Sequence, residues 1–235
     1  MLGIIAGGSF SPEVVESPEK KRVDTPFGEP SDYFSIGYLR GQEIAFLPRH
    51  GSEGIPPHRI NHRANIYALK KLGVAHIIGI NSVGSLKKEI PPGCIVIPHD
   101  YLCPWQIVTF YEHEREHITP GLDDELRARF LQAAAEAGVN YVKDGVYIQT
   151  IGPRLETKAE IVMMSTFGDV VGMTMAHEAT LCKEVGLAYA SICSVDNYGH
   201  GIVDTPLTEK LIMLKASENA AQIQRVLIRI MENLS

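Results

Sequence analysis

Residues 76–86 read His-Ile-Ile-Gly-Ile-Asn-Ser-Val-Gly-Ser-Leu, a short apolar run that ends in small polar residues. An isoleucine-rich run of this length predicts a buried strand over residues 76–80. The small residues at 81–86 let the backbone wrap a ligand, and they equally suit an ordinary turn from a strand into a helix. The segment therefore predicts a buried strand whose carboxyl end is a candidate binding edge.

Strand and helix patterns alternate over most of the chain. Further apolar runs predict strands at residues 3–6, 43–47, 94–98, 146–150, 170–173 and 188–193. Helical spacing of apolar residues predicts helices at 63–72, 122–137, 158–166, 178–185 and 207–234. The alternation predicts an α/β fold, a single-domain three-layer sandwich in which helices flank a central mixed β-sheet. Residues 1–235 are expected to form one domain, with the polar segment 11–32 as a mobile surface loop.

Composition narrows the class of ligand. The chain has 235 residues, 45% of them hydrophobic, which is enough for one sizeable core. The net charge of −6 argues against a general nucleic-acid or membrane-surface binder, so an anionic ligand must be held locally. The chain starts with neither a charged segment nor an apolar run of signal-peptide length, and we expect a cytoplasmic protein.

The cysteines and histidines offer no pattern typical of a metal site. The four cysteines lie far apart without a CxxC pair, at positions 94, 103, 182 and 193. Since the histidines are also scattered, we expect free thiols and neither a metal nor an organic cofactor.

Polar residues that follow predicted strands are candidates for an anion site. Arg49 and His50 come directly after residues 43–47, and an arginine fork suits two phosphate oxygens. Gly7-Gly8-Ser9 follows residues 3–6 and offers backbone N–H groups and a hydroxyl. A loop salt bridge for Arg49 and a plain tight turn at Gly7-Gly8-Ser9 are the alternatives.

Three further motifs are ambiguous on their own. Thr174 offers a hydroxyl to an anion and Met173 an apolar surface to a sugar, although methionines more often belong to the core. Asn197 carries the donors and acceptor needed to read a purine edge, but an Asx turn is common there. Glu156 precedes a helical pattern, where a surface carboxylate is the ordinary interpretation.

In this order the motifs resemble the nucleoside phosphorylase family that contains purine nucleoside phosphorylase and methylthioadenosine phosphorylase. The resemblance covers nearly the whole chain, and the overall pattern is closer to the methylthioadenosine branch. The stretches that carry it are Pro48-Arg49-His50-Gly51, His58-Arg59-Ile60-Asn61-His62-Arg63-Ala64-Asn65, residues 81–86 with Pro91-Pro92-Gly93, Gly152-Pro153-Arg154-Leu155-Glu156-Thr157, and Gly172-Met173-Thr174.

The resemblance implies a nucleoside phosphorylase-like fold and a role for each matching residue. Phosphate, a co-substrate rather than a cofactor, is expected to contact Ser9, Arg49, His50, Asn81, Ser82 and Thr174. The nucleoside is expected to contact Met173, Leu155, Glu156, Asn197, Tyr198 and Gly199. Asn197, Glu156 and His50 are the expected catalytic residues.

The base pocket departs from the branch that the overall pattern favours. Adenine-specific members carry aspartate at the positions of Asn197 and Gly199, and serine at that of Glu156. A carboxylate at 156 accepts from the N1–H of a 6-oxopurine but faces the N1 lone pair of adenine, and an unsatisfied buried group costs about 1–3 kcal/mol. We therefore expect phosphorolysis of inosine or guanosine. The alternatives are 5′-methylthioinosine or 5′-methylthioadenosine as substrate, a nucleosidase that uses water, and a non-catalytic purine-binding protein.

The sequence does not decide whether the pocket for the 5′ group binds a hydroxyl or a methylthio group. The resemblance implies that it is formed by the start of the last helix and by a neighbouring subunit. Leu207 and Leu211 suit a methylthio group, Glu209 suits a hydroxyl, and His117 is expected to reach a neighbour's site. A homotrimer, or a dimer of trimers, is the expected assembly.

Overall fold

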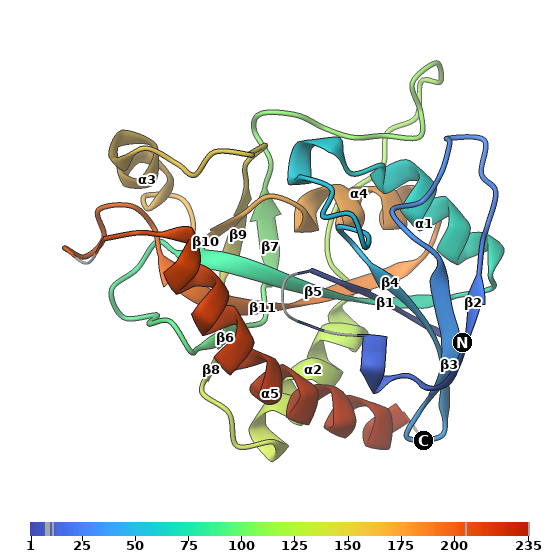
Figure 1. Ribbon diagram of the computed structural model, residues 1–235. Coiled ribbons are helices and arrows are strands. Elements are labelled where there is room, and N and C mark those ends of the chain that lie inside the picture. Colours follow the sequence, from blue (N-terminus) through green and yellow to red (C-terminus); the bar gives the residue numbers. More distant parts are fainter. Residues whose placement is uncertain (8–9, 11, 205, 235) are drawn as a thin grey trace.

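The computed structural model describes residues 1–7, 10, 12–204 and 206–234, which form the predicted α/β fold (Figure 1). The strands are β1 (Leu2–Ala6), β2 (Glu16–Lys21), β3 (Phe34–Leu39), β4 (Gln42–Pro48), β5 (His76–Ser85), β6 (Ile95–Val96), β7 (Asp100–Leu102), β8 (Tyr141–Val142), β9 (Val146–Gln149), β10 (Val170–Gly172) and β11 (Ala188–Tyr198). The helices are α1 (His62–Lys71), α2 (Asp124–Glu136), α3 (Lys158–Met164), α4 (Met175–Glu184) and α5 (Glu209–Leu234), with short 3-10 turns at Pro12–Val14 and Pro57–Arg59.

Three layers are visible in Figure 1, with α1 and α4 on one face of the sheet and α2 and α5 on the other. Over the described residues, eleven strands form one mixed sheet in the order β2-β3-β4-β1-β5-β10-β9-β7, with β11 beside β5 and β6, and β8 beside β6. One apolar cluster joins Ile4, Ile78 and Phe130 to the inner face of α5, and another joins Ile5, Ile77 and Leu69 to α4. The predicted three-layer sandwich is confirmed.

Strand β5 changes partner along one of its edges. Residues 76–80 pair in parallel with β1, whereas Gly84 and Ser85 pair in antiparallel fashion with β10. On its other edge, β5 pairs with β11 from one end to the other. Neither β1 nor β10 therefore pairs with residues 81–83, and this gap between two strand ends is the kind of place where α/β sheets bind ligands.

Several element boundaries differ from the sequence prediction. Residues 81–85 and 196–198, expected after their strands, continue β5 and β11, because the two strands pair with each other as far as Ser85 and Tyr198. The segment 11–32, expected to be a loop, includes β2, whose partner β3 the pattern also missed. All residues of β2 are exposed, so it carries no apolar alternation to detect. Among the described residues, no helix is long and apolar enough to cross a membrane.

Candidate active site

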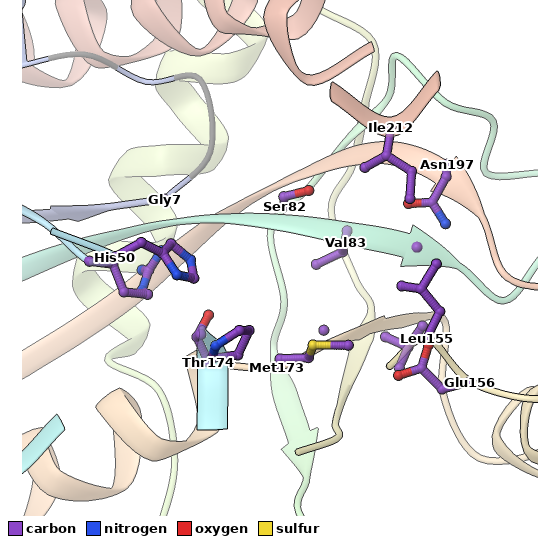
Figure 2. A pocket seen from close by; sticks show the side chains of 15 residues that line it. Gly7, His50, Ser82, Val83, Leu155, Glu156, Met173, Thr174, Asn197 and Ile212 are labelled. Carbon is purple, nitrogen blue, oxygen red and sulfur yellow. The ribbon is translucent and has the colours of Figure 1, made fainter. Parts of the chain in front are cut away.

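A cavity of about 200 Å³ lies at the partner change of β5. Its wall includes eight of the predicted site residues, which are Arg49, His50, Ser82, Leu155, Glu156, Met173, Thr174 and Asn197. Figure 2 shows His50 and Thr174 at one end and Leu155, Glu156 and Asn197 at the other, with Met173 between them. The fold thus brings these eight residues, from five separate segments, around one space whose two ends carry different chemistry.

Arg49 is held differently from the prediction. Its side chain is buried, and Nε and Nη2 donate to the two carboxylate oxygens of Glu178 at 2.5 and 3.0 Å. Nη1 also donates to Ile80 O at 2.7 Å, and Nη2 to Ile5 O at 3.1 Å. An arginine has five N–H donors, so these contacts leave one on Nη1. The fork therefore binds a buried carboxylate and not two phosphate oxygens, and the predicted contact of Arg49 with phosphate is left to the remaining N–H on Nη1.

Glu178 is not among the residues that the sequence predicts for the site. It is fully buried on α4 and also accepts from the hydroxyl of Tyr189 at 2.8 Å. A detectable pattern exists, since Glu178 is the one charged position on a helix face formed by Met175, Leu181 and Cys182. A lone acid on an apolar helix face predicts a buried partner, and here that partner is Arg49.

His50 faces the cavity with a defined tautomer. Its Nδ1 lies 2.7 Å from the carbonyl oxygen of Ile55, which can only accept, so Nδ1 carries the proton. Burial lowers the pKa of His50, and neighbouring Arg49 lowers it further. A Cβ on Gly7 would lie 2.9 Å from Arg49 Nη1 and 3.3 Å from His50 Nε2, so Gly7 leaves space where these two atoms meet. An arginine donor and a neutral imidazole acceptor together suit a phosphate that carries one proton.

The other predicted phosphate residues lie beside this pair. Asn81 is buried and donates through Nδ2 to Thr174 Oγ1, a cavity residue, at 2.9 Å. Ser82 lines the cavity, and its hydroxyl interacts with Asp196, a buried carboxylate that accepts from Ser194 and Asn219. Burial raises the pKa of Asp196, and the hydroxyl of Ser82 opposes that rise. The predicted contact of Ser9 lies outside the described residues.

Three histidines pack around the Arg49–Glu178 pair and make stability depend on pH. The ring of His62 is buried 5.2 Å from that of His177, and neither of its nitrogens has a hydrogen-bond partner among the described residues. Burial lowers the pKa values of His50, His62 and His177 below the ordinary 6.5. At these three histidines the folded state binds fewer protons than the unfolded chain below pH 6.5, so their contribution to the free energy of unfolding falls as pH falls.

Replacing His62 by phenylalanine is expected to flatten this dependence. Each histidine kept neutral contributes a slope of up to about 1.4 kcal/mol per pH unit, and the variant removes one of them. Urea unfolding at about pH 7.5 and 5.5 measures the difference. Asp196 titrates in the opposite sense in both proteins and cancels in the comparison. If the free energy of unfolding changed with pH as steeply in His62→Phe as in the wild type, the assignment of His62 as a buried neutral histidine would be contradicted.

Glu156 is held at the other end of the cavity. Its Oε1 accepts from the hydroxyl of Thr150 at 2.7 Å. Thr157, the next residue, is the N-cap of α3 and forms a capping box, in which its side chain and that of Glu160 each accept from the other's backbone N–H. Glu156 is therefore held by Thr150 on one side and by the capped start of α3 on the other, and it lines the cavity. It is not the freely solvated surface carboxylate that was the alternative interpretation.

Met173 lies in the middle of the cavity wall, and a glycine makes room for it. Gly152 has a φ of +70°, and a Cβ there would lie 2.6 Å from the sulfur of Met173. A larger residue at 152 would displace the methionine from the cavity. Leu155 also lines the cavity and remains 42% exposed.

Asn197 faces Glu156 from β11, across the end of β5. Its Nδ2 donates to Tyr198 O at 2.8 Å, which leaves a second N–H and the amide oxygen for a ligand. A Cβ on Gly84 would lie 3.0 Å from this nitrogen, so the amide packs against the backbone of β5. Tyr198 and Gly199, predicted to contact substrate, line a neighbouring hollow and are absent from the wall of this cavity.

The residues predicted for the 5′ group lie elsewhere. Leu207 and Leu211 line the neighbouring hollow, whereas Ile212, one residue further along α5, lines the cavity. The helix begins at Glu209, and its rotation directs Ile212 inward, which a sequence pattern fixes only to about one residue. Glu209 and His117 are exposed and are not in the wall described for this chain's cavity.

The comparison with known proteins agrees with this geometry. Residues 2–232 match the profile of the Phosphorylase superfamily. A probable 6-oxopurine nucleoside phosphorylase from Archaeoglobus fulgidus is 44% identical over 96% of this chain and 93% of its own length. A probable S-methyl-5′-thioinosine phosphorylase from Thermodesulfovibrio yellowstonii is 42% identical over 90% and 83%.

A solved structure extends the comparison to three dimensions. A variant of the adenosine/methylthioadenosine phosphorylase from Schistosoma mansoni, in complex with methylthioadenosine, superposes with a TM-score of 0.91 at 26% identity, over 99% of this chain and 91% of that one. Fold, cavity and similarity lead to one assignment. This chain is an enzyme of the Phosphorylase superfamily, and it belongs to the family of purine nucleoside and methylthioadenosine phosphorylases.

Proposed function

We propose that this chain is a 6-oxopurine nucleoside phosphorylase, which converts inosine or guanosine and phosphate into the free base and ribose 1-phosphate. The observation that carries the proposal is the pairing of Glu156 and Asn197 in the wall of one cavity. The Glu156 carboxylate accepts from N1–H, and the free N–H of Asn197 donates to O6 or N7. The 44% identical relative named as a probable 6-oxopurine nucleoside phosphorylase supports the same substrate class.

The mechanism follows from the two ends of the cavity. Phosphate, held by the remaining N–H of Arg49, by His50 and by Thr174, attacks C1′ of the ribose. The C1′–N9 bond breaks, its electron pair passes to the purine, and the base takes up a proton and leaves. The phosphate charge faces the developing sugar cation, while Asn197 stabilises the departing base. Met173, between the ends, contacts the ribose.

We further propose where the enzyme acts, that it needs no cofactor, and how its subunits assemble. The whole chain acts as one cytoplasmic phosphorylase domain, without a resident metal or organic cofactor. The assembly is a homotrimer or a dimer of trimers, in which His117 lies near a neighbouring subunit's cavity. Sedimentation velocity tests the assembly, since a monomer with full activity would contradict it.

A second candidate substrate is 5′-methylthioinosine. Ile212 places an apolar side chain in the cavity wall at the start of α5, which suits a methylthio group better than a hydroxyl. A relative named as a probable S-methyl-5′-thioinosine phosphorylase supports this possibility. The base-reading pair is the same for both substrates, so the two candidates differ only at the 5′ group.

Release of free base from five nucleosides tests the proposal. The substrates are inosine, guanosine, adenosine, methylthioinosine and methylthioadenosine, each assayed with and without phosphate. We expect phosphate-dependent release from the 6-oxopurine nucleosides, and the methylthio pair decides the 5′ group. Release without phosphate would identify a hydrolase, absence of release would leave a binding protein, and preference for the adenine nucleosides would overturn the base-reading pair.

A further inference from the structure

Thr150 contacts Glu156, and both residues line a second hollow that shares Glu156 with the cavity. Its hydroxyl lies 2.7 Å from Glu156 Oε1 and 3.4 Å from Gly172 O. Because the hydroxyl has a single hydrogen and the carboxylate oxygen is much closer, the hydrogen is donated to Glu156. Thr150 therefore contacts the residue that reads the base without lining the cavity itself.

The position of this hydroxyl is fixed by the sheet. The backbone N–H of Thr150 donates to Gly172 O at 2.8 Å and so extends the pairing of β9 with β10 by one residue. The side chain is 9% exposed, and a β-branched side chain has restricted rotation about χ1. The hydroxyl of Thr150 is thus held in place by the sheet, whereas its acceptor, Glu156, lies in the loop between β9 and α3.

The contact determines what Glu156 presents to a ligand. With Oε1 bound to Thr150, the second oxygen, Oε2, remains for the purine edge. A hydroxyl that donates to the carboxylate also keeps Glu156 in the role of acceptor. That role matches the N1–H of a 6-oxopurine and opposes the N1 lone pair of adenine.

We propose that Thr150 is a positioning residue for base selection, which orients Glu156 through this hydrogen bond. The proposal rests on the proposed function, in which Glu156 reads N1–H. Loss of a hydrogen bond to a charged group is expected to reduce the inosine-to-adenosine ratio of kcat/KM about tenfold or more in Thr150→Val. Thr150→Ser keeps the hydroxyl and is expected to retain the ratio, and KM for phosphate is expected to stay unchanged in both variants.

A double-mutant cycle separates positioning from general damage. In a Glu156→Gln background, Thr150→Val is expected to cause little further change in the ratio, because the charged acceptor is already gone. Thr166→Val is the matched control, since Thr166 lies just beyond α3 and its hydroxyl donates to Val162 O at 3.4 Å, its one hydrogen bond within the part of the chain that the structure describes. This control is expected to keep the wild-type ratio.

The kinetics of these variants distinguish the role of Thr150 from the proposed function itself. If the wild type prefers inosine and Glu156→Gln removes that preference while Thr150→Val does not, the role of Thr150 is overturned and the proposed function stands. Additive effects of Thr150→Val and Glu156→Gln would overturn it equally. If the wild type shows no preference for inosine and Glu156→Gln changes nothing, the proposed function itself is wrong.

Discussion

Replacing Glu178 by alanine is expected to lower the free energy of unfolding by about 3–5 kcal/mol, because it leaves a buried charge unpaired. The carboxylate accepts from both Nε and Nη2 of Arg49 and from the hydroxyl of Tyr189, and none of these groups reaches solvent. The same change is expected to raise KM for phosphate sharply, since Arg49 loses the partner that fixes its remaining N–H. Urea unfolding and phosphate-saturation kinetics measure the two effects.

Two controls make this expectation specific. Glu232→Ala breaks an exposed pair with Arg229 and is expected to cost less than about 1 kcal/mol. The double variant Arg49→Met, Glu178→Leu replaces both charges by apolar groups and is expected to recover much of the stability, but not phosphate-dependent turnover. Unaltered phosphate kinetics in Glu178→Ala would show that Arg49 has no part in the anion site.

Replacing Asn197 by aspartate is expected to move the enzyme toward adenosine. A carboxylate cannot donate to O6 of a 6-oxopurine, but it accepts from the exocyclic amine of adenine. The mismatch leaves buried polar groups unsatisfied, and we expect the inosine-to-adenosine ratio of kcat/KM to fall by about 100-fold. Steady-state kinetics with both nucleosides at saturating phosphate measure this ratio.

The control for Asn197→Asp is the same substitution at an exposed site. Asn140 lies between α2 and β8 with an exposed side chain, and Asn140→Asp is expected to leave the ratio unchanged. A thermal melt of Asn197→Asp separates a change in selectivity from unfolding, since the new carboxylate lies close to Tyr198 O. An unchanged base preference in a folded variant would remove Asn197 from base recognition.

The sequence was sufficient for the layers and for most cavity residues. Apolar runs such as residues 76–80 predict buried strands, and Arg49 follows a strand that runs parallel to β1 and therefore ends at the same edge of the sheet. The resemblance to the nucleoside phosphorylases, and not the order of the strands, placed Thr174 and Asn197 beside Arg49, since Thr174 follows a strand that is antiparallel to β5 and Asn197 lies within β11. The sequence pattern did not predict the exposed strand β2, because this strand has no apolar face.

Partner choice within the site was harder to predict. A sequence shows that Arg49 follows a strand, but not that Glu178, 129 residues away, occupies its fork. The rotation of α5 that selects Ile212 instead of Leu211 depends on where the helix begins and how it packs. The contact between Thr150 and Glu156 depends on the loop that returns from β9 to α3, which no periodicity describes.

The ratio of kcat/KM for inosine to that for adenosine, at saturating phosphate, tests the central claim most directly. If Glu156 and Asn197 read the purine edge as proposed, the wild-type enzyme prefers inosine by about 100-fold or more. A ratio near one, or a preference for adenosine, would contradict the claim and would mean that these two residues do not select the base.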